Sequence, residues 1–85
     1  MGLKRLTRTE TFNFFIIKEQ LSFDHYLIVV YRKLDDKMLY AGKVNWKRFT
    51  ISMNGQVNKG IVKMNKRERK LLEILINRGS KKAEE

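Results

Sequence analysis

The spacing of the apolar residues changes in the second half of the chain. Across residues 49–64 apolar and polar residues alternate, which is the pattern of a β-strand with one buried face. From Lys66 onward the apolar residues recur three or four positions apart, which indicates an amphipathic helix. The pattern therefore predicts a β-hairpin that leads directly into a C-terminal helix.

Further strands are predicted in the first half of the chain from runs of aromatic and β-branched residues. These runs are residues 11–17, 26–33 and 38–44. Together with the hairpin and the helix they predict an α+β fold, with a small antiparallel sheet of four or five strands followed by one C-terminal amphipathic helix. Asp35 and Asp36 are typical turn formers, and a turn centred on them places Tyr31 opposite Tyr40.

Asn54 and Gly55 predict a two-residue hairpin turn of type I′, in which both central residues need a positive φ. Such a turn sets four pairs: Ser52 with Val57, Thr50 with Lys59, Arg48 with Ile61, and Trp46 with Lys63. One face of the ribbon is then basic and aromatic: Trp46, Arg48, Lys59 and Lys63. The other face is apolar and is expected to be buried: Phe49, Ile51, Met53 and Val62, with Gly60 across from Phe49.

Asn65 and Glu68 have the spacing of a capping box and predict that the helix begins here. Its apolar residues cover roughly 200° of the helical wheel, more than one surface stripe. They are Leu71, Leu72, Ile74, Leu75 and Ile76. This wide arc predicts a homodimer through the helix. The alternative is that the N-terminal segment around Leu3 and Leu6 folds over the helix and completes a monomeric core.

The chain organisation predicted from these elements is simple. A basic arm occupies residues 1–10, one domain covers residues 11–79, and a disordered tail follows at residues 80–85, after Gly79 ends the helix. The sequence lacks cysteine, which excludes disulfides and thiolate chemistry and fits a cytoplasmic, intracellular protein. No apolar run approaches the roughly 20 residues of a membrane span, so no membrane partner is expected.

The formal net charge of +10 favours a polyanionic partner, and nucleic acid is the commonest one. The excess is concentrated between residues 43 and 70, where Glu68 is the single acidic residue. The basic residues there are Lys43, Lys47, Arg48, Lys59, Lys63, Lys66, Arg67, Arg69 and Lys70.

Catalytic chemistry finds little support in the sequence. His25 is the one histidine, and its neighbour Asp24 is expected to point to the opposite face of a strand. Asp35 and Asp36 are better explained as turn residues than as metal ligands. With no phosphate loop, metal cluster or nucleophile motif, we expect a non-enzyme without a cofactor or metal.

The basic and aromatic face of the ribbon is the predicted binding site. A base can stack on Trp46 while Arg48, Lys59 and Lys63 hold phosphates, with help from Lys43, Lys47 and the helix-start cations Lys66, Arg67, Arg69 and Lys70. Two alternatives stay open. Trp46 can belong to the core, and the helix-start cations can form an ordinary solvated helix surface.

The stretch NKGIVKMNKRERKLLEIL, residues 58–75, resembles the last strand and helix of the positive cofactor 4 type of transcriptional coactivator, and KVNWK at residues 43–47 is similar to a segment of its small bacterial members. In this resemblance Lys59, Gly60, Ile61 and Met64 match the strand, and Leu71, Leu72 and Leu75 match the helix interface. It covers about a third of the chain. It implies a curved sheet that binds single-stranded nucleic acid, dimerisation through the helices and a role in transcription regulation. This chain departs from the pattern at residues 66–70, which are more basic, and its first strands do not align.

Residues 49–79 also resemble the start of the winged-helix effector domains of response regulators, although the recognition helix and wing that should follow are missing. The sequence thus leaves two functions open. The first is non-catalytic binding of single-stranded DNA or RNA. The alternative is a small regulatory interaction module, of phage-inhibitor or truncated winged-helix type, that docks on an acidic protein.

Overall fold

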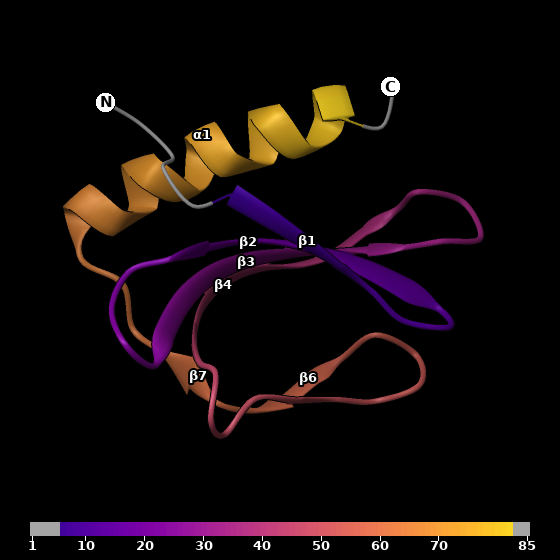
Figure 1. Cartoon of the computed structure of the whole chain (residues 1–85), viewed down its shortest axis with the longest axis horizontal. Coiled ribbons are helices and arrows are strands. Elements are labelled where there is room, and N and C mark those ends of the chain that lie inside the picture. The colour runs from indigo at the N-terminus through magenta and orange to yellow at the C-terminus, as the bar shows by residue number, and fades with distance from the viewer. Residues whose placement is uncertain (1–5, 83–85) are drawn as a thin grey trace.

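The chain forms one main antiparallel sheet with a helix on one face and a short hairpin on the other (Figure 1). The computed structural model describes residues 6–82, with side chains described for residues 7–78. The main sheet has five strands in the order β1-β2-β3-β4-β7, and β5 pairs with β6. The elements are β1 (Leu6–Glu10), β2 (Phe14–Gln20), β3 (His25–Arg32), β4 (Met38–Asn45), β5 (Thr50–Ile51), β6 (Val57–Lys59), β7 (Ile61–Val62) and α1 (Lys66–Lys82). The predicted α+β fold is confirmed.

The core consists of two apolar layers, one on each face of the main sheet. On the helix face Leu27 and Val29 pack with Leu75 of α1, and all three are fully buried. On the opposite face Ile28 and Val30 pack with residues of the β5–β6 hairpin. Because both faces are covered, β2 and β3 carry nearly continuous apolar runs instead of strict alternation.

The turn at Asn54 and Gly55 exists, but it differs from the predicted type. Its loop has three residues, and of the two predicted turn residues Gly55 alone has a positive φ, of 93°. The Gly55 amide donates to the Ser52 carbonyl oxygen at 3.0 Å, as in hairpins that combine a turn with a glycine bulge. The extra loop residue shifts the register, so Val57 lies opposite Ile51 and not opposite Ser52.

The hairpin ladder ends after Thr50 and Lys59, which pair as predicted. The chain then leaves β6, and β7 pairs with β4 at the edge of the main sheet, with Ile61 opposite Val44. Two predicted pairs are therefore wrong: Arg48 with Ile61, and Trp46 with Lys63. The wrong pairs came from extending one ladder through a point where the chain changes sheets.

The change of sheet takes place at Gly60, where φ is 94°. A Cβ atom at this position would lie 2.9 Å from the backbone nitrogen of Phe49 and 3.0 Å from the carbonyl oxygen of Asn45. The Asn45 amide also donates to the Gly60 carbonyl oxygen at 2.7 Å. Both the dihedral angle and the close approach require glycine, and the predicted closeness of Gly60 to Phe49 is confirmed.

The predicted pairing of Tyr31 with Tyr40 is wrong. A bulge between Val30 and Tyr31 places Tyr31 opposite Met38 and Tyr40 opposite Val30. The two tyrosines consequently lie on opposite faces of the sheet. Tyr31 is buried on the helix face and stacks on Phe15 with 5.3 Å between ring centroids, whereas Tyr40 packs on the hairpin face.

The structure differs from the prediction at both ends of the domain. Residues 6–10, which were expected in a basic arm, form edge strand β1, while residues 1–5 lie outside the described part. Helix α1 continues through Gly79 to Lys82, since one helical glycine costs only about 1 kcal/mol. The predicted helix end at Gly79 is therefore wrong, and of the predicted tail only residues 83–85 lie outside the described part.

Candidate nucleic-acid interface

The predicted capping box at the start of α1 is confirmed. The Glu68 amide donates to Asn65 Oδ1 at 2.8 Å, and the Asn65 amide donates to Glu68 Oε1 at 3.0 Å. Lys43 Nζ of β4 lies 3.0 Å from Glu68 Oε2, and each side chain is only 16% exposed. The hydrogen bond from the Asn65 amide, followed by that from Lys43, lowers the pKa of Glu68. Lys43 thus fixes the helix start to the sheet, which leaves its charge largely compensated within the chain.

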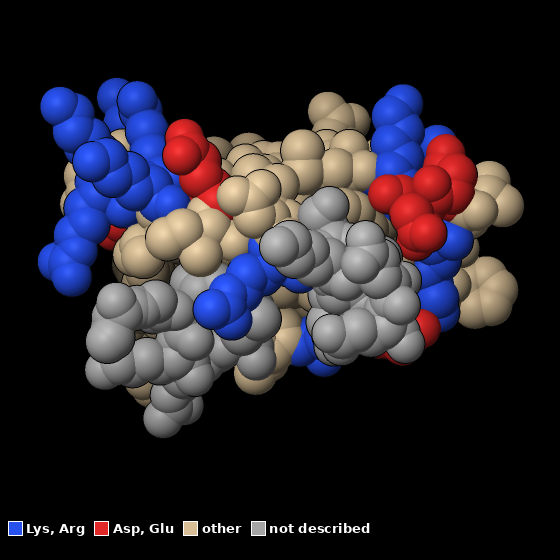
Figure 2. Space-filling model, turned by 90° about the horizontal axis from the view of Figure 1, so that it is seen from above, with Lys and Arg blue, Asp and Glu red and all other residues tan. Residues whose placement is uncertain are grey.

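The other cations at the start of α1 face solvent. They are Lys66, Arg67, Arg69 and Lys70, and within residues 7–78 no carboxylate forms an ion pair with any of them. Figure 2 shows Lys and Arg side chains gathered at the end of the molecule where α1 begins. The helix N-terminus is itself partly positive, so these charges raise the local potential and favour an anionic ligand.

Trp46 belongs to an aromatic cluster on the hairpin face of the sheet. Phe49 stacks on it with 4.9 Å between ring centroids and an interplanar angle of 7°, and Tyr26 lies 5.2 Å away. Lys18 Nζ is 4.2 Å from the centre of the indole ring. Because these partners occupy the surface of the half-buried indole, a stacking base would first have to displace Lys18. The structure therefore favours the core alternative for Trp46.

Lys18 is a residue that sequence reasoning missed. It extends from β2 between Trp46 and Thr9, whose Oγ1 accepts a hydrogen bond from Lys18 Nζ at 3.0 Å. Partial burial lowers the pKa of Lys18. One signal was available, since Lys18 follows Phe14 and Ile16 at the two-residue spacing that places all three on the hairpin face of β2.

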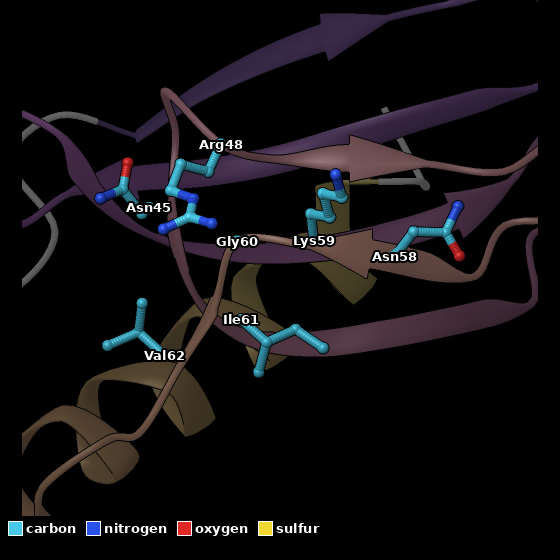
Figure 3. A pocket seen from close by; sticks show the side chains of 7 residues that line it. All are labelled: Asn45, Arg48, Asn58, Lys59, Gly60, Ile61 and Val62. Carbon is cyan, nitrogen blue, oxygen red and sulfur yellow. The ribbon is translucent and has the colours of Figure 1, made fainter.

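Arg48 and Lys59 are brought together at an open depression of about 430 Å³ (Figure 3). Arg48 comes from the turn between β4 and β5, and Lys59 comes from β6. In Figure 3 Asn45 and Arg48 lie on one side of Gly60, and Lys59 and Asn58 lie on the other. The remaining lining residues are Ile61 and Val62. The predicted shared face of Arg48 and Lys59 is thus a concave site, although Trp46 is not among its lining residues.

Lys47 and Lys63 lie outside this depression. Lys63 is exposed in the segment between β7 and α1, which connects the depression to the helix start. Lys47 is exposed as well, and its Nζ lies 4.6 Å from the ring centre of Phe23. We call the exposed cations of this region the basic end: Lys47, Arg48, Lys59, Lys63, Lys66, Arg67, Arg69 and Lys70.

The apolar residues of α1 are mostly covered by the chain's own sheet. Leu72 is 8% exposed and Leu75 is fully buried, so these two residues of the predicted dimer interface are covered within a single chain. Leu71 and Ile76 pack partly against the same cluster. Ile74 is 40% exposed and is the main apolar residue of the predicted interface that faces solvent. The sheet therefore covers a wider arc of the helix than predicted, since Leu71, Leu72, Leu75 and Ile76 all pack against its helix-face core.

Asp24 and His25 do not point apart as predicted. Asp24 lies in the bend before β3, and its Oδ1 is 2.9 Å from His25 Nδ1. The hydroxyl of Ser22 lies 3.4 Å from the same ring nitrogen. A catalytic triad needs its carboxylate and its nucleophile on different nitrogens of the imidazole, so this cluster lacks that arrangement. Among the described residues no group of His, Asp and Glu side chains is placed to hold a metal ion.

Comparison with known proteins gives no relative: no family model matches the chain, and no curated protein or solved structure is significantly similar to it. The likeness to the coactivator family therefore stays a hypothesis based on residues 58–75. Within residues 6–82 no helix has the length and apolar character needed to cross a membrane.

Proposed function

We propose that this protein binds single-stranded nucleic acid without catalysis, through the basic end. The observation that carries the proposal is the placement of eight exposed cations, from the β4–β5 turn to the first turns of α1, without ion-pair partners among residues 7–78. Unpaired cations held close together repel one another, and phosphates relieve that repulsion while releasing counterions. We expect the protein to act in the cytoplasm, where such strands are accessible.

The preference for single strands is supported by the shape of the site. A depression of about 430 Å³ between two cations can admit an unpaired nucleotide, which a duplex does not offer. Trp46 contributes to the proposed site by supporting the turn that carries Arg48, because its indole packs against the sheet through Tyr26. Stacking of a base on Trp46 is not part of the proposal.

The proposal is tested by fluorescence anisotropy with labelled DNA and RNA single strands and the matching duplex, at roughly 50 and 200 mM salt. We expect single strands to bind more tightly than the duplex, with affinity falling linearly in the logarithm of the salt concentration. Absence of binding to any strand at low salt would contradict the proposal. Binding of a polyglutamate peptide in that case would favour the alternative, an acidic protein partner for the same cations.

A homodimer through α1 stays a prediction. The apolar surface of α1 that remains exposed for such a contact is small. Ile74 is its centre, with the exposed edges of Leu71 and Ile76 beside it. Light scattering at micromolar concentration should give twice the monomer mass for the wild type and the monomer mass for Ile74→Lys. A wild type that stays monomeric at high concentration would exclude the dimer and leave nucleic-acid binding by a single chain intact.

A further inference from the structure

The depression between the β4–β5 turn and β6 contains neutral hydrogen-bonding groups as well as cations. Asn58 is exposed, and within residues 7–78 its side-chain amide forms no hydrogen bond, so its donors and its acceptor are all available. On the other side Asn45 Oδ1 accepts from the Lys47 amide at 3.0 Å, which holds the Asn45 side chain in place and leaves its NH₂ group as a donor. Phosphate binding alone needs neither amide.

Ile61 adds an apolar surface to the same depression. It is 59% exposed, although it is a large aliphatic residue on an edge strand next to Lys59. An exposed isoleucine beside two cations gives no benefit to phosphate binding. The face of a nucleobase, however, is apolar and can cover such a side chain.

We infer that this depression binds one unpaired nucleotide and discriminates between bases. In this arrangement Arg48 and Lys59 hold the flanking phosphates, Ile61 contacts the face of the base, and Asn58 forms hydrogen bonds with its edge. A carboxamide offers a donor and an acceptor side by side, which matches the paired groups on a base edge. The inference rests on the proposed function and adds base selectivity to it.

The geometry of the site is fixed by the backbone. Arg48 and Lys59 lie on separate segments that cross at Gly60, where the Phe49 backbone is too close for any side chain at position 60. The close backbone approach therefore fixes the relative position of the two segments that carry the cations, which lowers the entropy cost of bringing both to one ligand.

The test uses the full chain and short labelled homopolymers of deoxyadenosine, deoxycytidine and thymidine, about 12 nucleotides long, within the site sizes of small single-strand binders. We expect the wild type to bind its best homopolymer about tenfold more tightly than its worst. Asn58→Ala should reduce that ratio to within about twofold and leave the salt dependence unchanged, because no phosphate contact is lost. Asn77→Ala on the exposed surface of α1 is the matched control and should keep the full ratio.

Ile61→Thr provides an independent readout. It keeps a β-branched residue in β7 while removing apolar contact, so it should weaken all homopolymers by a similar factor. Circular dichroism confirms that each variant is folded. Equal affinity of the wild type for all homopolymers, or a base ratio that survives Asn58→Ala, would overturn the inference and leave the proposed function standing. Only the absence of all nucleic-acid binding at low salt would contradict both the base-selectivity inference and the proposed function.

Discussion

The two ends of the molecule carry charge in opposite ways. At the basic end, exposed cations of the β4–β5 turn and the start of α1 have no ion-pair partners within residues 7–78. At the other end, where the β1–β2, β3–β4 and β5–β6 turns gather (Figure 1), Arg32 and Lys33 are paired, while Lys37 has no ion-pair partner within residues 7–78. Lys33 binds Glu10 at 2.9 Å, and Arg32 binds Asp35 at 2.7 Å. The overall net charge of the chain does not reveal this difference, whereas the positions and partners of the charged side chains do.

The turn end is also the apolar one. Three large side chains, one from each turn, are more than four-fifths exposed: Phe12 at 91%, Leu34 at 87% and Met53 at 85%. They line one open depression of about 600 Å³. At the basic end Trp46 packs inside while the charges face solvent, although Phe23, which lies beside Lys47, is 79% exposed. The following substitutions compare matched residues at the two ends.

The largest difference is expected for the aromatic residues. Trp46→Ala should lower the free energy of unfolding by on the order of 2–4 kcal/mol, since it removes contacts with Tyr26, Phe49 and Lys18. Phe12→Ala should change it by less than about 0.5 kcal/mol because that side chain is exposed. Urea denaturation measures both. Equal effects would mean that Trp46 is not part of the core.

Cations are compared by two double variants that remove the same charge. Lys66→Gln with Arg67→Gln should weaken single-strand binding on the order of tenfold and lower the salt slope by about 1.4, which corresponds to two lost phosphate contacts. Arg32→Gln with Lys33→Gln should leave affinity and slope close to those of the wild type. If the two double variants weaken single-strand binding equally, the net charge of the protein controls binding and the location of the charge does not.

The carboxylates differ between the ends as well. Glu68→Ala removes a helix cap and the partner of half-buried Lys43, and should cost about 1–2 kcal/mol of stability. Asp35→Ala breaks a solvent-exposed ion pair with Arg32, so we expect no measurable shift of the thermal midpoint. Glu68→Ala should also strengthen nucleic-acid binding, because it removes the one negative charge among the helix-start cations. A loss of affinity in a folded Glu68→Ala protein would contradict this explanation.

The pH dependence gives the smallest effect. The pKa of Glu68 is lowered in the folded protein by the Asn65 amide and by Lys43, so the folded state binds this proton less tightly than the unfolded state. Its contribution to stability is therefore present above the ordinary value of 4.5 and is lost as pH falls through the folded pKa. Between about pH 6 and pH 3 the thermal midpoint should fall less in Glu68→Gln than in the wild type. The same decrease in both proteins would assign the acid sensitivity to groups other than Glu68.

Local signals in the sequence predicted local structure well. The capping residues Asn65 and Glu68 and the turn at Asn54 and Gly55 act within a few residues, so the helix start and the hairpin were found. Strand β1 was missed because an exposed edge strand with little apolar surface has no distinctive pattern. The pairing of Tyr31 was wrong because the turn spans residues 33–36 and is not centred on Asp35 and Asp36, so Tyr31 pairs with Met38, and a bulge beside Val30 shifts the ladder again.

At the candidate site too, local neighbours were predicted from the sequence and contacts between distant segments were not. Arg48 and Lys59 were placed on one face correctly, since the Thr50–Lys59 pair fixes them near each other in the hairpin. The surroundings of Trp46 could not be foreseen, because Lys18 and Tyr26 reach it from β2 and β3 of the main sheet. Contacts between distant segments depend on the change of sheet after β6, which no short pattern in the sequence marks.

The glycine at position 60 has a consequence for how the site can evolve. Any other residue there must both adopt an unfavourable dihedral angle and collide with the Phe49 backbone, so substitution at position 60 is expected to disrupt the floor of the depression. The side chains around it, such as Asn58 and Lys59, are exposed and contribute little to folding. Selection can therefore exchange the rim residues one at a time without loss of the fold, and ligand preference in descendants of this chain can diverge above an unchanged backbone.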